Sequence, residues 1–371
     1  MAEIAGRFFS PREAKVTWVG GAKEPKQSPA LFMVDPGAVV ELVIGVGLGP
    51  IGAAVVRQVV ARKGFQIVAA VDIDPNKFGR DVGDVVDLGK KTRVRVSTDV
   101  GKTIRSSKPD VVVLCTSSSL RRVLPQLEEV LKYKVPVVST TEELSYPAPY
   151  NRRLAKRLDA AARKAKVAVL GTGVNPGFTM DALPITLTGV CERVDRIEVQ
   201  RVQDARSRRL PFQQKIGCGL TTAQFQKKVD EGTVRHVGLS ESIQMIADAM
   251  GWKLDRITDD IQPKIADRTV ESEYLAVDSG YVCGIIQDGA GYVNGSPLIT
   301  LHMEAYLGAP ESFDSVLIEG SPRLYSKVAG GVHGDVATAS IAVNSIPRVI
   351  AAAPGLRTMR DMPIPSYFGG R

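Results

Sequence analysis

From about residue 40 onward, the order of apolar and polar positions predicts short buried strands separated by helices. Runs of consecutive β-branched residues are typical of strands covered on both faces, and apolar residues at helical spacing indicate amphipathic helices. The expected strands are 67–71, 94–97, 111–115, 135–139 and 167–170, and the clearest helices are 120–131 and 153–164. This alternation predicts an N-terminal Rossmann domain of the α/β class, with a doubly wound parallel sheet.

The pattern changes after Arg193. Strict alternation of apolar and polar residues, with a helix expected at 240–251, predicts a second, α+β domain; the alternating positions are Ile197, Val199, Ile299, Leu301 and Met303. A last helix is expected at 335–350. We therefore divide the chain into an N-terminal extension (1–38), a dinucleotide-binding Rossmann domain (39–175), an α+β substrate and oligomerisation domain (176–332), and a C-terminal helix and tail that pack back on the Rossmann domain (333–371).

The loop after the first expected strand carries the strongest chemical signal. Gly47, Gly49 and Gly52 form a G-x-G-x-x-G pattern with Pro50 and Ile51. Such glycines permit a tight turn, let the backbone approach a pyrophosphate, and let the following helix pack closely on the sheet. The pyrophosphate then lies at the helix N-terminus, where unpaired N–H groups favour negative charge. This pattern predicts a dinucleotide cofactor.

The choice of cofactor depends on Asp72, which ends the second strand about 20 residues after the glycines. A carboxylate here accepts hydrogen bonds from a ribose 2′-hydroxyl and repels a 2′-phosphate, which favours NAD. Lys77 and Arg80 follow closely and would neutralise a phosphate if Asp72 turned away, so NADP stays open.

Composition excludes several classes of protein. The net charge is +8, but the basic residues are scattered without an aromatic-interleaved stripe, so we expect no nucleic-acid partner. No apolar run approaches the roughly 18 residues of a membrane span, and we expect a soluble, cytoplasmic protein without a membrane partner. The four cysteines and three histidines are dispersed and match no metal-binding spacing, so we expect no metal site.

Three polar segments follow strands whose carboxyl ends should meet at one sheet edge, where ligands bind in such folds. The first contains Thr116, Ser117 and Ser118 and would pass beside the nicotinamide, although a plain polar turn explains it equally well. The third is a glycine-containing turn at 171–178.

The middle segment contains Glu142 and Glu143. If the backbone stays extended, one of the two side chains points into the cleft while the other faces away. A carboxylate in the cleft would act as a general base or activate water. The alternative is that both are first-turn residues of a helix, favoured there by the helix dipole.

Two further candidates are basic. The segment 201–212 concentrates guanidinium groups, which suit a substrate carboxylate, although a solvated loop or an ion-pair cluster explains them as well. His333 lies between glycines, where a structural hydrogen bond is the common function of a lone histidine.

Four blocks taken together resemble the 2,4-diaminopentanoate dehydrogenase family, which is related to native amine dehydrogenases and has a dihydrodipicolinate-reductase-like N-terminal domain. The blocks are 139–147 (STTEELSYP), 171–181 (GTGVNPGFTMD), 201–217 (RVQDARSRRLPFQQKIG) and 330–347 (GGVHGDVATASIAVNSIP). The resemblance implies NAD(P)-dependent oxidative deamination of 2,4-diaminopentanoate to 2-amino-4-oxopentanoate and ammonia, by a homodimer. It also implies an active-site glutamate in the STTEEL segment, for which we choose Glu142 over Glu143.

We expect additional site residues in these blocks and in the polar segments. The additional cofactor-binding candidates are Thr116, Ser117, Ser118, Asn175 and Asn344, and the substrate-binding candidates are Thr141, Asn175, Phe178, Arg206, Arg209 and His333. The extension and the arginine-rich loop depart from what the family leads us to expect. Two alternatives therefore stay open: an amine dehydrogenase that aminates simple ketones or aldehydes, and a non-catalytic, dinucleotide-binding regulatory protein.

Overall fold

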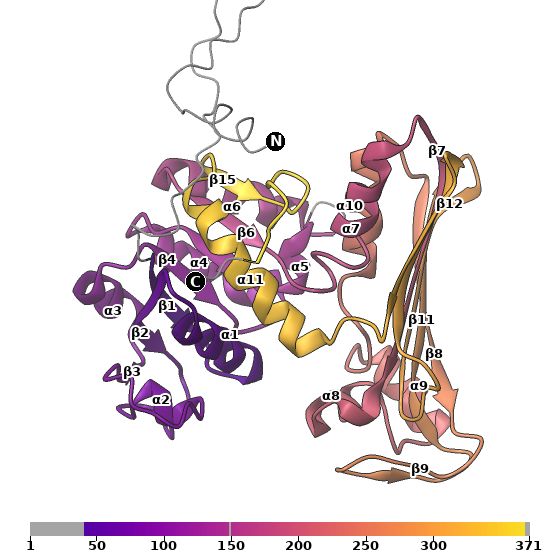
Figure 1. Ribbon diagram of the computed structural model, residues 1–371, viewed down its shortest axis with the longest axis horizontal. Coiled ribbons are helices and arrows are strands. Elements are labelled where there is room, and N and C mark those ends of the chain that lie inside the picture. The colour runs from indigo at the N-terminus through magenta and orange to yellow at the C-terminus, as the bar shows by residue number, and fades with distance from the viewer. Residues whose placement is uncertain (1–40, 148–149, 368–371) are drawn as a thin grey trace, which may run out of the picture. The chain divides into compact units, whose positions relative to one another are not determined.

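The computed structural model describes residues 41–147 and 150–367, so the expected extension 1–38 lies outside the described part of the chain. The first lobe contains a seven-stranded sheet whose pairings are all parallel, in the order β15-β6-β5-β4-β1-β2-β3. Its strands are β1 (Glu41–Val46), β2 (Phe65–Val71), β3 (Val96–Ser97), β4 (Val111–Leu114), β5 (Val137–Ser139), β6 (Ala168–Gly171) and β15 (Gly355–Arg357). This confirms the predicted doubly wound Rossmann sheet (Figure 1).

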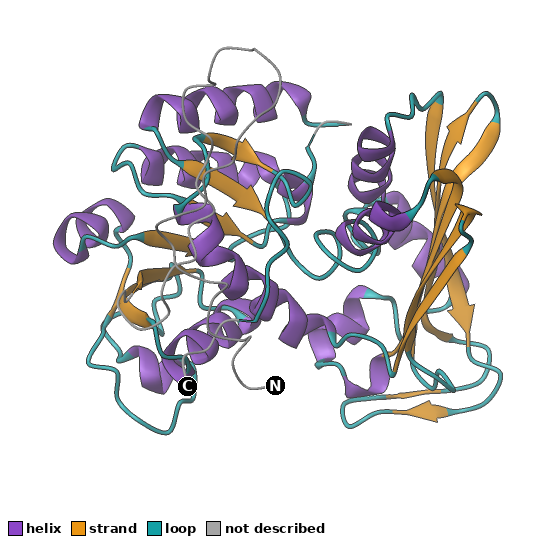
Figure 2. Ribbon diagram, turned by 45° about the horizontal axis from the view of Figure 1, so that its top comes forward, coloured by secondary structure: helices purple, strands orange, loops and turns teal. Residues whose placement is uncertain are grey.

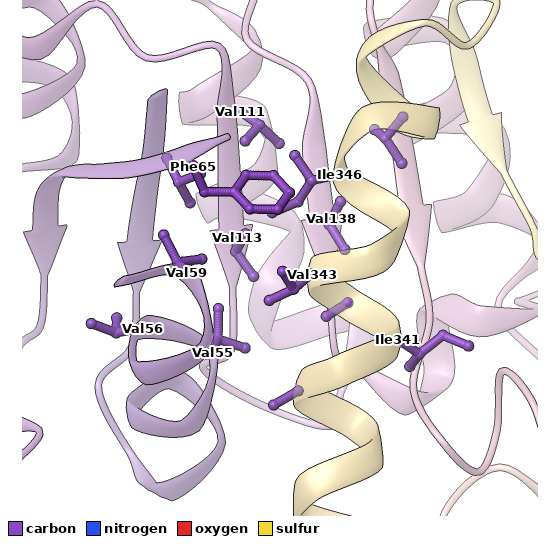
Figure 3. Packing of buried hydrophobic residues seen from close by; sticks show 14 of the residues in the cluster. Val55, Val56, Val59, Phe65, Val111, Val113, Val138, Ile341, Val343 and Ile346 are labelled. Carbon is purple, nitrogen blue, oxygen red and sulfur yellow. The ribbon is translucent and has the colours of Figure 1, made fainter. Parts of the chain in front are cut away.

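Helices cover both faces of this sheet. They are α1 (Pro50–Ala61), α2 (Val82–Val85), α3 (Val100–Ser107), α4 (Leu120–Leu131), α5 (Glu142–Ser145), α6 (Arg152–Ala165) and α11 (Gly334–Ile350). Alternate residues of β4 serve the two faces: Val111 and Val113 pack with α1 and α11, whereas Val112 and Leu114 pack with α4 and α6. Figure 3 shows the first of these cores, where Val343 and other α11 side chains lie against the α1 side of the sheet.

The second lobe is built on a six-stranded mixed sheet in the order β14-β13-β7-β12-β11-β8. Its strands are β7 (Arg193–Asp204), β8 (Arg256–Ile265), β11 (Val282–Val293), β12 (Ser296–Tyr306), β13 (Phe313–Ser321) and β14 (Leu324–Ala329), and a separate hairpin pairs β9 (Val270–Glu271) with β10 (Ala276–Val277). The remaining helices are α7 (Ala182–Leu187), α8 (Leu210–Lys215), α9 (Thr222–Asp230) and α10 (Leu239–Met250), with short 3-10 turns at Thr188–Val190 and Ala205–Ser207. The helices lie on one side of this sheet (Figure 2), and Leu239, Ile243 and Ile246 of α10 are part of its core.

The predicted element bounds agree with the structure where the apolar pattern is long. The helix expected at 120–131 is α4, and those at 153–164, 240–251 and 335–350 are α6, α10 and α11 with shifts of one residue at their ends. Strand β15 was not predicted, because its three residues carry no periodic pattern and pair with β6 only once the chain has returned to the sheet. No helix in the described residues is long and apolar enough to cross a bilayer.

Candidate active site

The loop between β1 and α1 has the geometry of a phosphate-binding turn. Gly47 has a φ of 83°, and a Cβ added at Gly52 would lie 1.8 Å from the Gly47 carbonyl oxygen. A Cβ added at Gly49, by contrast, would meet nothing within 4 Å. Gly47 is therefore required by the turn and Gly52 by the close approach of α1 to it, while Gly49 leaves open space beside the N-terminus of α1, where a pyrophosphate is favoured.

Asp72 follows β2 and is fixed by three donors. Its carboxylate accepts hydrogen bonds from the N–H groups of Leu48 (2.7 Å) and Asp74 (2.9 Å) and from the Lys77 ammonium (3.0 Å). Burial alone would raise the pKa of Asp72, but these donors outweigh it and hold the pKa below its ordinary value. Asp72 therefore presents an anion at the end of β2, with the Lys77 cation beside it.

A cavity of about 380 Å³ lies where the carboxyl ends of the parallel strands face the second lobe. The first lobe contributes Ile51, Cys115, Thr116, Ser117, Ser118, Thr140, Glu142 and the turn Thr172–Pro176 to its lining, together with Gly334, Asp335 and Thr338 of α11. The second lobe contributes Arg201, Gln203, Arg208, Arg209, Pro211, Phe212, Lys215, His236 and Met303. The lining thus combines polar strand ends from one lobe with a predominantly cationic surface from the other.

The two adjacent glutamates of α5 lie in different surroundings. Glu142 lines the cavity. The Glu143 carboxylate instead accepts the Leu120 N–H at 2.8 Å and the Ser119 hydroxyl at 3.3 Å, so it caps the N-terminus of α4. Glu142 is therefore the carboxylate of this pair that is available for chemistry in the cavity.

Neighbouring candidates divide in the same way. The Thr141 side chain is fully buried and donates to the Ser117 carbonyl at 2.8 Å, and Thr140 lines the cavity instead. The Thr141 hydroxyl therefore links two strand-end segments, and the structure does not support substrate contact by its side chain. Thr116, Ser117 and Ser118 do line the cavity, as expected of residues beside a nicotinamide.

Arg208 is the buried cation of the arginine-rich segment. Its guanidinium lies 4.0 Å from the centre of the Phe212 ring and donates to Asp335 at 3.0 Å and to Gln203 at 3.3 Å. Arg209 also lines the cavity and donates to Asp335 at 3.4 Å. Arg206 is 51% exposed, pairs with Asp204 and lies outside the cavity lining, so the structure does not support it as a substrate ligand.

His236 lines the cavity and was not among the predicted residues. Its backbone N–H and carbonyl are both held by the Gln287 side chain, at 2.9 and 3.0 Å. Burial and the nearby cations Lys215, Arg201 and Arg208 lower the pKa of its imidazole to about 3, so the ring is neutral at physiological pH. His333 is exposed, precedes α11 and does not line the cavity.

Arg201, which begins the arginine-rich segment 201–212 but was not chosen as a ligand, forms part of the cavity wall. It is 2% exposed, pairs with the equally buried Asp314, and donates to the Val332 carbonyl at 2.7 Å and to Thr179 at 3.3 Å. Burial lowers the pKa of this guanidinium, against the opposing effect of Asp314. Arg201 interrupts the apolar residues of β7 that face the core, and this break in the pattern could have distinguished it from the other arginines of the segment.

Of the three remaining candidates, only Asn175 lies in the cavity lining. Asn175 lines the cavity, and its amide contacts the Met180 sulfur at 3.1 Å. Phe178 packs against the hydrophobic core of the first lobe. Asn344 accepts a hydrogen bond from Arg62, next to the C-terminal end of α1, and is not in the cavity lining. Contact of Phe178 with substrate and of Asn344 with cofactor therefore have no support from the structure.

Several buried polar atoms of the cavity lack a partner. Among the described residues, five buried side-chain nitrogen or oxygen atoms make no hydrogen bond, and four belong to residues that line this cavity: Thr172 Oγ1, Asn175 Oδ1, Arg208 Nε and His236 Nδ1. Each such atom costs about 1–3 kcal/mol when left without a partner. Their concentration in one cavity is the expected arrangement for a polar ligand. No cluster of three or more potential metal ligands occurs in the described part of the chain.

Two family models match consecutive parts of the chain. Residues 42–169 match the model of the dihydrodipicolinate reductase N-terminus, and residues 178–370 match that of the 2,4-diaminopentanoate dehydrogenase C-terminal domain. The chain is 36% identical over 335 residues to 2,4-diaminopentanoate dehydrogenase of Acetoanaerobium sticklandii, covering 88% of this chain and 95% of the relative.

More distant relatives are amine dehydrogenases. The chain is 23% identical to that of Streptomyces virginiae, covering 87% of this chain and 96% of the relative. The solved structure of amine dehydrogenase from Mycobacterium smegmatis superposes with a TM-score of 0.79 at 25% identity, covering 89% of this chain and 98% of that one. The cavity therefore lies in a Rossmann-type, dinucleotide-binding dehydrogenase.

Proposed function

Because this chain belongs to the 2,4-diaminopentanoate dehydrogenase family, we propose that it catalyses NAD-dependent oxidative deamination of 2,4-diaminopentanoate to 2-amino-4-oxopentanoate and ammonia. The observation that carries the proposal is the charge arrangement of one cavity. Glu142 supplies a carboxylate on the side of the first lobe, and Arg208, Arg209 and Lys215 supply cations on the other. A diamino acid presents the complementary charges, ammonium and carboxylate, in a single small molecule.

The residues of the first lobe fit a bound dinucleotide. Gly47, Gly49, Pro50, Ile51 and Gly52 would hold the pyrophosphate at the N-terminus of α1, and Asp72 would accept a ribose hydroxyl. The polar strand-end residues 116–118 and Asn175 would line the nicotinamide end, where the cofactor accepts a hydride. The anionic Asp72 supports NAD over NADP, because it repels a 2′-phosphate.

Glu142 has three tasks in this proposal. It accepts a proton from the substrate ammonium, stabilises the iminium that remains after hydride loss, and orients the water that attacks it. In sum, the substrate ammonium form, NAD⁺ and water yield the ketone, ammonium, NADH and one proton. No metal is needed, because a carboxylate suffices for each of these proton transfers.

The second lobe would recognise the substrate carboxylate. Arg208 has an unpaired, buried Nε and a guanidinium fixed between Phe212 and Asp335, so it needs little reorganisation to bind an anion. Arg209 and Lys215 lie in the same wall and add positive charge. The neutral His236 offers a further polar contact without adding charge.

An amine dehydrogenase acting on simple ketones and ammonia is the second candidate, supported by the fold shared with the Mycobacterium smegmatis enzyme. Such substrates carry no carboxylate, so they would leave the cationic wall without a partner. The regulatory alternative has less support, because both curated relatives named above are dehydrogenases. We further propose a cytoplasmic homodimer: the family resemblance supports the dimer, and the unpaired cysteines support a reducing compartment.

The test is reduction of NAD and of NADP, followed by nicotinamide absorbance, with 2,4-diaminopentanoate, simple amines and ordinary amino acids as substrates. We expect the highest kcat/KM for the diamino acid with NAD. Turnover of simple amines alone would move the assignment to amine dehydrogenase. Cofactor binding without turnover of any amine would contradict both enzymatic readings.

A further inference from the structure

The loop between α9 and α10 brings His236 to the candidate active site and is held at two points. Gln287, a fully buried residue of β11, accepts from the His236 backbone N–H at 2.9 Å and donates to its carbonyl at 3.0 Å. Two residues further on, Gly238 packs against the first lobe so closely that an added Cβ would lie 2.3 Å from Cδ of Pro176. The backbone that carries the imidazole is therefore fixed before any ligand binds.

The imidazole has one nitrogen without a partner. His236 Nδ1 is buried and makes no hydrogen bond, and the same is true of Arg208 Nε in the wall of the same cavity. Arg208 Nε always carries a proton, so only an acceptor can satisfy it. A neutral imidazole carries its one proton on either ring nitrogen, so Nδ1 is either a free donor or a free acceptor. The charges around the ring decide between the two.

Those charges are predominantly positive. Burial and four cations lower the pKa of His236, and three of these cations, Arg201, Arg208 and Lys215, line the same cavity. The carboxylate on this side of the cavity, Asp335, is already paired with two arginines. A substrate ammonium at Nδ1 would be repelled by the three cations, whereas a carboxylate would be attracted. Nδ1 therefore fits an anion, which it can bind only as an N–H donor.

We propose that His236 is a specificity-determining residue for the substrate carboxylate: its Nδ1–H donates to one carboxylate oxygen while Arg208 donates to the other. This inference rests on the proposed function for the identity of the anion, and it deepens that function by adding a neutral donor to the charged ones. The neutral ring supplies a directional hydrogen bond without adding to the repulsion among the cations. Its contribution should be larger for a carboxylate than for a neutral carboxamide, because hydrogen bonds to ionised acceptors are stronger.

The experiment is titration calorimetry on the full chain saturated with NAD. The probe is sodium pentanoate, which has the carboxylate and five carbons of the substrate but no amine to oxidise, and pentanamide is the neutral control. We expect saturable binding of pentanoate, and a loss of affinity of about tenfold in His236→Leu. His236→Asn places an amide N–H where Nδ1 was, so its affinity should stay within about threefold of the parent. Pentanamide should bind more weakly than pentanoate and lose less affinity in His236→Leu.

The matched control is His302→Leu. His302 precedes Met303 of the cavity lining but lies on the opposite face of β12, because side chains alternate along a strand. Its loss should leave pentanoate affinity unchanged.

A second measurement needs no variant that alters the complex. The chain has three histidines, so long-range ¹H–¹⁵N spectra of the histidine-labelled protein contain three sets of ring signals, and His236→Asn identifies the set of His236. In the complex with NAD and pentanoate, we expect the proton of His236 on Nδ1. An unprotonated Nδ1 in this complex would overturn the inference.

The calorimetric outcomes are equally decisive. Absence of saturable pentanoate binding would overturn the inference, as would an affinity unchanged in His236→Leu. Equal losses for pentanoate and pentanamide, or a loss in His236→Asn as large as in His236→Leu, would show that the ring serves only the shape of the cavity and would also overturn it.

Turnover of 2,4-diaminopentanoate by the parent tests the proposed function separately. Pentanoate binding that depends on His236, without turnover of the diamino acid, would contradict the proposed reaction and support the carboxylate subsite. Turnover of the diamino acid, with pentanoate binding indifferent to His236, would support the reaction and overturn the subsite.

Discussion

The two lobes contribute to the candidate active site by different physical means. The first lobe presents backbone: a turn that only glycine permits at Gly47, an open approach at Gly49, and strand ends that meet at one sheet edge. The second lobe presents long charged side chains, such as Arg201 and Arg208, which reach the cavity from a strand and from a loop and are held there by carboxylates far away in the sequence.

This difference corresponds to two kinds of recognition, that of the cofactor and that of the substrate. The pyrophosphate of a dinucleotide is the same in every enzyme that uses one, and local backbone geometry is sufficient to bind it. A substrate differs from enzyme to enzyme, and its recognition rests on side chains placed by tertiary packing. We therefore expect changes in the first lobe to affect the reaction in general and changes in the second lobe to affect the choice of substrate.

The sharpest test of this division is Glu142→Gln, the acid that the first lobe contributes. The neutral amide cannot accept the ammonium proton or orient water as a base, so kcat should fall by about 10²- to 10⁴-fold with every amine tested. NAD affinity, measured by fluorescence titration, should stay within about twofold, because in the proposed arrangement the glycine turn and Asp72 hold the dinucleotide while Glu142 acts on the substrate amine.

Glu143→Gln is the matched control. It changes the adjacent glutamate, which caps α4 rather than lining the active-site cavity. We expect a loss of about 0.5–1 kcal/mol in unfolding free energy and little change in kcat. A large loss of kcat in Glu143→Gln, with Glu142→Gln active, would reverse the assignment of the two residues.

A smaller effect, confined to one class of substrate, is expected from Arg208→Met in the second lobe. The change keeps volume but removes the cation, so kcat/KM for the diamino acid should fall by roughly 10- to 100-fold, the usual worth of a charged hydrogen bond. For amines without a carboxylate, kcat/KM should stay within about threefold, because they have no group for Arg208 to bind.

The control for this pair of measurements is Arg206→Met, two residues away. Arg206 is exposed and pairs with Asp204, so its loss should leave both classes of substrate unaffected. Equal losses with both substrate classes in Arg208→Met would show that Arg208 supports the fold of the cavity rather than selecting a carboxylate.

The same division explains what the sequence could predict. The glycine turn, Asp72 and the placement of Glu142 follow from local order, because a strand, a turn and a helix are adjacent in the chain. The choice between Glu142 and Glu143 agrees with the cavity lining, but the reason lies in the start of α4, 23 residues away in sequence, where Leu120 requires a cap.

For the second lobe, the sequence predicted the fold but not which side chains line the cavity. Arg201 depends on Asp314 and His236 on Gln287, contacts that join residues 113 and 51 positions apart. Arg208 lay inside the segment singled out but was not chosen, whereas Arg206 was, because sequence alone does not say which side chain within or just after a short 3-10 turn points inward. The prediction for Asn344 met a related difficulty: its helix does approach the cavity, but near its start, with Asp335 and Thr338, and Asn344 is not in the lining.

The smallest expected effect returns to the first lobe and sharpens the statement that its backbone serves a common cofactor. Lys77 is 23% exposed and pairs with Asp72, partly neutralising the charge that discriminates against a 2′-phosphate. Lys77→Met should therefore raise the preference for NAD over NADP, as a ratio of kcat/KM values, by about two- to fivefold, the range of a partly exposed ion pair. Lys91→Met, which removes an exposed lysine paired with Asp84, should leave the ratio unchanged. If Lys77→Met shifts the ratio toward NADP, Lys77 holds Asp72 in place for the ribose instead of shielding its charge, and cofactor choice would then depend on side-chain positioning as much as substrate choice does.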